Sequence, residues 1–541
     1  MALKKRKKQY SGVILFLLGG LIVLAQVGNV SAASNAPSGP DRYTYTYVDH
    51  SIFQWWMMAW EDSELFCKID VEHEGLPTFW EIYVDCGEDL ADAWLTQEAC
   101  PIEIFTNDVR ECPGYYMHLA STVPAQREVA LALPPPVVWL TLQDCLVDGI
   151  TNRCERPPTL VLHGDEPLTE EKIISVTGVV DGESFTCFGS LCELPLEETD
   201  EEGIQLSFWA ASSYGDTSYA FDAHIRVTLS EDEEGKPFWY VDVLSSQWRG
   251  EANASCAESW DAFPPVGGAP EWLSSPEDVR ELESDLAYAY LAGNLIEIGV
   301  VNADHCPDFG LDFRGQATAC GLEAAQPAML EWQNRFDTLI LKAAEETSVP
   351  AALLKRLFAR ESQFWPGTFN EGRDVGLGQL TTEGADFAFL WNPIFFEQFC
   401  PLVFDGETCG GGYLHLDADQ QERLRGALVY SVNATCETCP LGVDLTQADF
   451  SVNVFANTLL ASCEQAGRVV YNNTDQAPGE TTSYEDLWKF TLLNYNAGAG
   501  CLSLAIGETL DQDQELNWEN LSQNLTYVCM GTKDYVEDIS E

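Results

Sequence analysis

The stretch SVPAALLKRLFARESQFWPGTFNEGRDVGLGQLTT, residues 348–382, decides the fold of the region around it. Its first part predicts a helix, because Ser348 is a favourable N-cap and Pro350 lies in the first turn, where a missing N–H is tolerated. Apolar side chains then recur at helical spacing and lead into a carboxylate, in the order Leu353, Leu354, Leu357, Phe358 and Glu361. Pro366-Gly367 ends the helix shortly afterwards. We therefore expect an amphipathic helix whose last turn carries the carboxylate.

Glu361 is expected to have a raised pKa. In a helix it faces the same side as Leu354, Leu357 and Phe358. Apolar neighbours and the negative end of the helix dipole both disfavour the charged form of a carboxyl group. A carboxyl that keeps its proton near neutral pH suits general acid catalysis. We therefore interpret Glu361 as the candidate proton donor.

Short motifs follow one another in this part of the chain. They are Glu361-Ser362, Gly376-Leu377-Gly378-Gln379, Asn453 with Leu459-Leu460, Asn494-Tyr495-Asn496-Ala497-Gly498-Ala499-Gly500, and Tyr535-Val536. In this order they resemble the motifs of the lytic transglycosylases of the soluble (SLT) type, which share the goose-lysozyme-like fold. The resemblance implies an all-α lysozyme-like domain over residues 276–541. It covers about the C-terminal half of the chain.

The same resemblance implies a reaction. Glu361 would act first as acid and then as base in cleavage of the MurNAc–GlcNAc β-1,4 bond of peptidoglycan glycan strands. The muramic C6 hydroxyl would attack the anomeric carbon, so that a 1,6-anhydro sugar forms without water, a second carboxylate or a cofactor. The residues that the resemblance places at the substrate are Ser362, Gly376, Gln379, Tyr495 and Asn496.

The loop after the helix departs from the family pattern. Gly378 replaces a Met, and residues 368–375 lack the usual Ser-x-x-Gly-Ala sequence. The loop carries two possible second acids, Glu371 and Asp374. If either positions a water molecule, the enzyme is a muramidase-type hydrolase that releases a reducing sugar. Residues 395–445 are expected to form a disulfide-braced insertion beside the cleft.

A rival from another class is a non-catalytic cell-wall-binding protein that keeps the fold. The presence of Glu361, Gln379 and Tyr495 together argues against it. None of the seven His residues shows metal-type spacing, and Cys436-x-x-Cys439 has no matching second pair, so we expect no metal site and no organic cofactor.

The charge of the chain excludes some partners. The sequence has 541 residues, and its 86 acidic against 28 basic residues give a formal net charge of −58. Such a field repels nucleic acid phosphates and anionic lipid headgroups, so neither is an expected partner.

The N-terminal residues 1–33 are expected to be a signal peptide or membrane anchor. Lys4–Lys8 is basic, Val13–Val27 is apolar, and Val30-Ser31-Ala32 offers a cleavage site. The 18 cysteines, an even number, favour disulfides formed in an oxidising compartment. We therefore expect an extracytoplasmic protein, secreted or at the cell surface, which touches a membrane only through an uncleaved N-terminal segment.

Two further modules precede the helical domain. Residues 42–136 read as a mixed module that includes a strand-like run, Phe79–Val84, and ends in prolines. Residues 137–249 contain short β-type runs between turn signals, which predict a disulfide-stapled, β-sandwich-like module. Helices are then expected over Pro276–Ile298, capped by Ser275, and over Glu323–Thr347. The predicted fold class is multidomain, with β-rich modules followed by an all-α domain.

Overall fold

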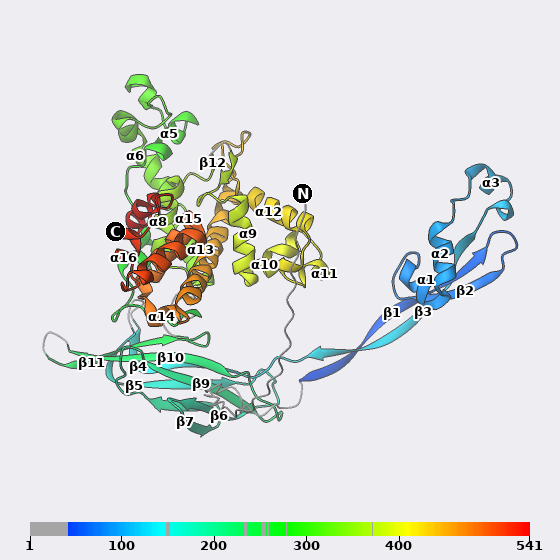
Figure 1. The fold of residues 1–541 in the computed structure, drawn as a ribbon, viewed down its shortest axis with the longest axis horizontal. Helices are drawn as coiled ribbons and strands as arrows, with labels where there is room; N and C mark the ends of the chain where they lie inside the picture. The colour runs from blue at the N-terminus through cyan, green and yellow to red at the C-terminus, as the bar shows by residue number, and fades with distance from the viewer. Residues whose placement is uncertain are drawn as a thin grey trace, which may run out of the picture.

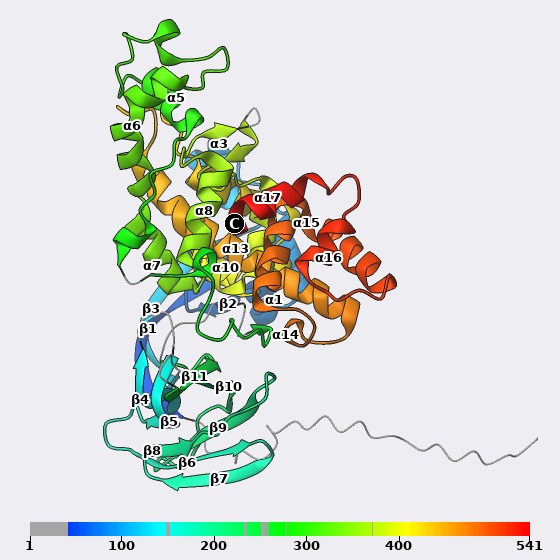
Figure 2. The same ribbon diagram turned by 90° about the vertical axis from the view of Figure 1, so that its left-hand side faces the viewer.

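The computed structural model describes residues 42–147, 152–231, 235–249, 256, 259–276, 278–369 and 372–541. It has a β-rich N-terminal half and a helical C-terminal region, seen from two sides in Figure 1 and Figure 2. The predicted leader, residues 1–33, lies outside the described residues. Within the described part, no helix has the length and hydropathy needed to cross a membrane.

The N-terminal module is a long two-stranded ribbon with a small head at its far end (Figure 1). Strand β1 (Tyr43–Ala59) pairs along its whole length with β3 (Tyr115–Ala132), whereas β2 (Leu65–Val71) pairs only with Phe53–Met58 of β1. The head adds the helices α1 (Phe79–Cys86), α2 (Glu88–Thr96) and α3 (Ile102–Asn107). Its core holds only five fully buried side chains, so the bridges Cys67–Cys86 and Cys100–Cys112 carry much of its stability.

The prediction of a strand at Phe79–Val84 is wrong, because these residues form the helix α1. The Thr78 side chain accepts a hydrogen bond from the Glu81 backbone, and Glu81 accepts one from the Thr78 backbone. This capping box starts a helix despite the aromatic and β-branched residues that follow. The spacing of Thr78 and Glu81 is the local signal that contradicts a strand.

Residues 137–244 form one antiparallel sheet of eight strands. The strands are β4 (Val137–Val147), β5 (Asn152–Asp165), β6 (Ile173–Val180), β7 (Glu183–Phe188), β8 (Leu191–Pro195), β9 (Ile204–Ser212), β10 (Phe221–Glu231) and β11 (Pro237–Leu244). Their order is β4-β5-β11-β10-β9-β6-β7, with β8 paired to β5. The expected antiparallel strands are present, but they belong to a single hydrogen-bonded sheet and not to the two sheets of a sandwich.

This sheet curls like half a barrel around its own core. Strands β4 and β9, which are distant in the pairing order, approach one another, and so do β5 and β6. Buried residues from both ends of the order, among them Leu140, Leu162 and Phe208, belong to one apolar cluster. Cys145–Cys154 and Cys187–Cys192 staple strands together, and all 18 cysteines of the chain are paired in nine disulfides, as the sequence predicts.

The C-terminal region is built on two long helices, α13 (Leu445–Thr474) and α15 (Tyr484–Asp511), which pack on each other. Around them lie α5 (Ala289–Glu297), α6 (Ala319–Asn334), α7 (Asp337–Thr347), α8 (Ala351–Ser362), α9 (Thr382–Trp391), α10 (Pro393–Phe399), α11 (Gly406–Cys409), α12 (Ala418–Val432), α14 (Pro478–Thr481), α16 (Trp518–Gln523) and α17 (Gly531–Ser540). One large apolar cluster joins them. A short hairpin, β12 (Thr368–Phe369) with β13 (Asp374–Val375), follows α8.

Two helix boundaries differ from the sequence prediction. The single helix expected over Pro276–Ile298 is absent, since only its last part, α5, is α-helical. The helix expected over Glu323–Thr347 is interrupted between α6 and α7, at Arg335 and Phe336. Both errors concern breaks between short helices, which a continuous apolar pattern does not reveal.

A disulfide between distant residues joins the linker after the sheet to the helical region. Cys256 is bonded to Cys463 of α13 across 207 residues of sequence. Nearby, the Trp260 indole packs so closely on Gly467 that a side chain there would collide with it. Cys256 and Trp260 therefore attach this part of the chain to α13 of the helical domain.

Candidate active site

Helix α8 carries the candidate acid, and a distant segment caps its start. Ser348 is not the N-cap, because it adopts a left-handed conformation (φ 55°) at the end of α7. The Ser275 hydroxyl accepts a hydrogen bond from the Ala351 N–H at 2.9 Å instead, so Ser275 caps α8 and not the helix that we expected after it. The helix ends at Ser362, where Gln363 turns left-handed.

Glu361 lies in the last turn of α8 and is partly buried. Burial raises the pKa of its carboxyl from 4.5 to about 7, against the opposing effects of a Tyr535 hydrogen bond and the Arg360 charge. The Tyr535 hydroxyl donates that bond to Glu361 Oε1 at 2.5 Å. Near neutral pH the carboxyl is therefore divided between its protonated and ionised forms, which suits a group that first gives and then takes a proton.

Tyr535 comes from α17, 174 residues further along the chain, and it is 5% exposed. The Arg360 guanidinium lies over its ring at 5.5 Å and pairs with Asp538 of the same helix at 3.0 Å. Tyr535 is part of the closing Tyr-Val motif, but the sequence alone assigned it no role. The structure places its hydroxyl directly on the candidate acid.

The glycine-rich loop brings Gln379 to the end of α8. Gln379 has a left-handed backbone (φ 56°), and its side-chain amide donates to the Glu361 backbone carbonyl. Gly376 (φ 77°) passes close to α12, since a β-carbon there would lie 2.9 Å from the Val432 carbonyl oxygen. Val432 is the last residue of α12. The segment 395–445, expected to be an insertion, therefore packs against the loop at Gly376.

Position 378 requires a glycine for a steric reason. A β-carbon at this position would collide with the ring of Phe455, which is fully buried on α13. The Gly378 carbonyl accepts a 2.7 Å hydrogen bond from the Tyr495 hydroxyl. The Phe455 ring therefore leaves no space for a Met side chain at position 378. The Tyr495 hydroxyl stabilises the loop through its hydrogen bond to the backbone carbonyl of Gly378.

Two other predicted substrate residues have protein partners. Asn496 is exposed, and its side-chain oxygen accepts a hydrogen bond from Thr532 at 3.0 Å. Ser362 is 2% exposed, and its hydroxyl donates to the Phe358 carbonyl within α8. Asn496 is thus accessible to a ligand. Ser362 is buried, and its hydroxyl bonds only to the backbone of its own helix among the contacts described.

Of the two possible second acids, Glu371 lies outside the described residues. Asp374 belongs to β13 and is partly buried. Its negative charge makes a contribution, smaller than that of burial, to the raised pKa of Glu361. The charge of Asp374 therefore acts on the candidate acid.

One group of potential metal ligands occurs among the described residues, formed by His305, Cys306 and Cys320. Cys306 and Cys320 form a disulfide, which leaves a single imidazole as a ligand. This group is not suited to hold a metal ion.

Comparison of the sequence with models of known protein families and with curated proteins finds no match.

Proposed function

We propose that the chain is a peptidoglycan lytic transglycosylase that cleaves the MurNAc–GlcNAc β-1,4 bond. The observation that carries the proposal is Glu361, a partly buried carboxyl with a pKa of about 7, bonded to Tyr535 and adjoining the glycine loop. The proposed substrate follows from the resemblance of the motifs. The proposed proton donor follows from the burial and raised pKa of Glu361.

In the proposed reaction Glu361 protonates the glycosidic oxygen as the bond to the anomeric carbon breaks. The carboxylate then accepts the proton of the muramic C6 hydroxyl, whose oxygen bonds to the anomeric carbon. Tyr535 steadies the ionised carboxylate between the two steps by its hydrogen bond. Glu361 ends protonated again, and no water is consumed.

A muramidase is the second candidate, and Asp374, whose charge acts on Glu361, favours it. In that reaction Asp374 would orient a water molecule toward the anomeric carbon, and the product would carry a reducing end. The two reactions share their first proton transfer and differ in the nucleophile.

Product analysis tests the proposal. Purified peptidoglycan is digested with the wild-type chain, and the fragments are weighed by mass spectrometry. We expect muropeptides lighter by one water than reducing-end products. Glu361→Gln should lower the rate by about 10²-fold or more, because the proton donor is lost. Glu345→Gln, an exposed position on α7, is the matched control and should leave the rate unchanged.

Each other outcome decides between the alternatives. Reducing ends alone would establish the muramidase, and equal activity of Glu361→Gln would rule out Glu361 as the acid. Binding of the glycan by wild type without any release would identify a non-catalytic wall-binding protein.

The pH profile supplies a further prediction. The reaction begins with protonated Glu361, so activity should fall as the pH rises through about 7. Asp374→Asn removes a charge that raises the pKa of Glu361, so the falling limb should move to lower pH. A transglycosylase keeps its anhydro product in this variant, whereas a muramidase that depends on Asp374 loses most of its activity.

A further inference from the structure

One edge of the N-terminal ribbon has no neighbouring strand among the described residues. Strand β2 covers β1 only from Phe53 to Met58, so residues 43–52 of β1 pair with β3 on one side and with no described strand on the other. Two-stranded ribbons are marginally stable in water, and a third strand adds stability. An added strand that pairs with residues 43–52 of β1 would lie on the same side of β1 as β2.

The two edges of the ribbon differ in chemistry. Free edges in natural proteins usually carry charges or prolines that prevent pairing with other chains. The β3 edge has them, at Pro124, Arg127 and Glu128. The β1 edge reads Tyr-Thr-Tyr-Thr-Tyr-Val over Tyr43–Val48, with no charge, proline or glycine. Over residues 43–48 the β1 edge therefore lacks the charges and prolines that oppose strand pairing, and Asp49 marks the end of this uncharged stretch.

Side-chain exposure agrees with an unoccupied surface. Residues 43, 45 and 47 point to the same face of the strand, because side chains alternate along it. Tyr43, Tyr45 and Tyr47 are 47%, 64% and 65% exposed, respectively. A row of exposed tyrosines beside an unpaired backbone edge is a surface suited to another β-strand.

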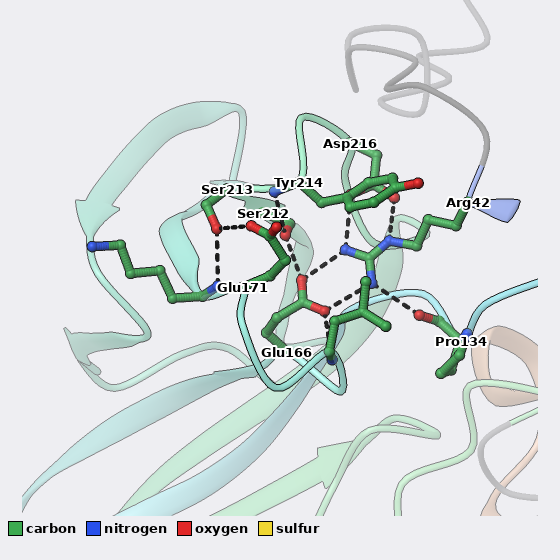
Figure 3. A network of polar contacts seen from close by, with 10 residues as sticks. Arg42, Pro134, Glu166, Glu171, Ser212, Ser213, Tyr214 and Asp216 are labelled. Carbon is green, nitrogen blue, oxygen red and sulfur yellow. Dashed lines mark hydrogen bonds and ion pairs between the residues drawn. The ribbon is translucent and has the colours of Figure 1, made fainter. Parts of the chain in front are cut away.

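The base of this ribbon is fixed to the curled sheet (Figure 3). Arg42, directly before β1, is buried and bonds to both carboxylate oxygens of Glu166 at 2.7–2.8 Å and to Asp216. It also donates to the Pro134 carbonyl beyond β3, and the Tyr214 ring lies 5.0 Å from its guanidinium. Both strands of the ribbon are therefore held at its base, next to the unpaired edge.

We propose that Tyr43–Tyr47 pairs with the same segment of a second copy of this chain, antiparallel and centred on Tyr45. Residues 43–47 read the same in both directions. In this register Thr44 faces Thr46 of the other copy, Tyr43 faces Tyr47, and Tyr45 faces its own counterpart. Aromatic pairs and Thr–Thr pairs are favourable across strands. The product is a four-stranded sheet made of two ribbons, and it does not depend on the proposed reaction.

Charge gives the pairing a specific salt dependence. Each copy carries a formal net charge of −58, so two copies repel each other at low ionic strength. Because the proposed edge contains no charged group, added salt removes repulsion without weakening the contact. The dimer should therefore tighten as salt is added, whereas a basic partner held by ion pairs would be released.

Cysteine cross-linking tests the register in the full-length chain. All native cysteines are paired, so Tyr45→Cys introduces the sole free thiol. We expect Tyr45→Cys to form a disulfide-linked dimer on mild oxidation, since facing residues lie within bonding distance. Tyr47→Cys alone should form no disulfide-linked dimer, because Tyr47 faces Tyr43 and not its own counterpart, but it should cross-link when mixed with Tyr43→Cys. Equal cross-linking of Tyr45→Cys and Tyr47→Cys, or none in any sample, would overturn the proposal.

Sedimentation velocity tests the association itself at 0.1 M and 1 M NaCl. Thr44→Asp with Thr46→Asp places like charges opposite each other and should weaken the dimer about tenfold or more. Ala130→Asp, on β3 beside Tyr45, is the matched control and should leave the dimer intact. A wild-type chain that is monomeric at both salt concentrations, or that associates only at low salt, contradicts pairing through this edge.

Discussion

The helical domain and the N-terminal head keep their shapes by different means. In the helical domain Trp488 is 1% exposed within one large apolar cluster. In the head, Trp80 is 68% exposed, and five buried side chains with two disulfides make up the core. Periodic apolar patterns therefore describe the helical domain well, whereas the head depends on cross-links that no periodicity reveals.

The largest effect should come from a buried ion pair in the helical domain. Lys355 of α8 donates to both oxygens of Asp337 at 2.7 and 2.9 Å, and the side chains are 7% and 3% exposed. Lys355→Ala leaves the Asp337 carboxyl buried without its partner, so the free energy of unfolding should fall by about 3–5 kcal/mol. Denaturant unfolding followed by tryptophan fluorescence measures the loss.

Lys342→Ala is the control for this change, because its pair with Glu346 is exposed and should contribute about 1 kcal/mol or less. Equal losses for Lys355→Ala and Lys342→Ala would contradict the role assigned to burial.

A medium effect should follow from opening a bridge of the head. Replacing Cys67 and Cys86 by Ala removes a disulfide that links residues 19 positions apart. The free energy of unfolding of the head should fall by about 3 kcal/mol. Hydrogen exchange should rise in the head while the helical domain stays protected.

Replacing Cys436 and Cys439, only three residues apart, should cost less because a shorter loop is released. Faster exchange in the helical domain of the Cys67/Cys86 variant would show that the two regions are not independent.

The smallest effect should come from the surface of the head. Trp80→Ala should change the free energy of unfolding by about 1 kcal/mol or less, since the indole is mostly exposed. Trp488→Ala, the same substitution in the helical domain, should cost about 3–5 kcal/mol. Thermal unfolding of both variants checks the contrast, and a large loss at Trp80 would mean that the head has a core beyond its five buried residues.

The sequence predicts what depends on neighbours along the chain. The helical spacing from Leu353 to Phe358 is local, and α8 with the acid in its last turn follows from it. The cap at Ser275 and the hydrogen bond from Tyr535 join residues 76 and 174 positions apart, respectively, so no local pattern contains them. The curled single sheet was missed for the same reason, because pairing order is set by contacts between distant strands.

The bond between Cys256 and Cys463 also has a consequence for the response of the chain to proteolysis. A protease that cuts any surface loop between these residues leaves the two fragments covalently joined. A nicked chain would therefore migrate as one piece until a reductant is added. Proteolytic damage would then accumulate without immediate loss of the α13 fragment from the rest of the molecule.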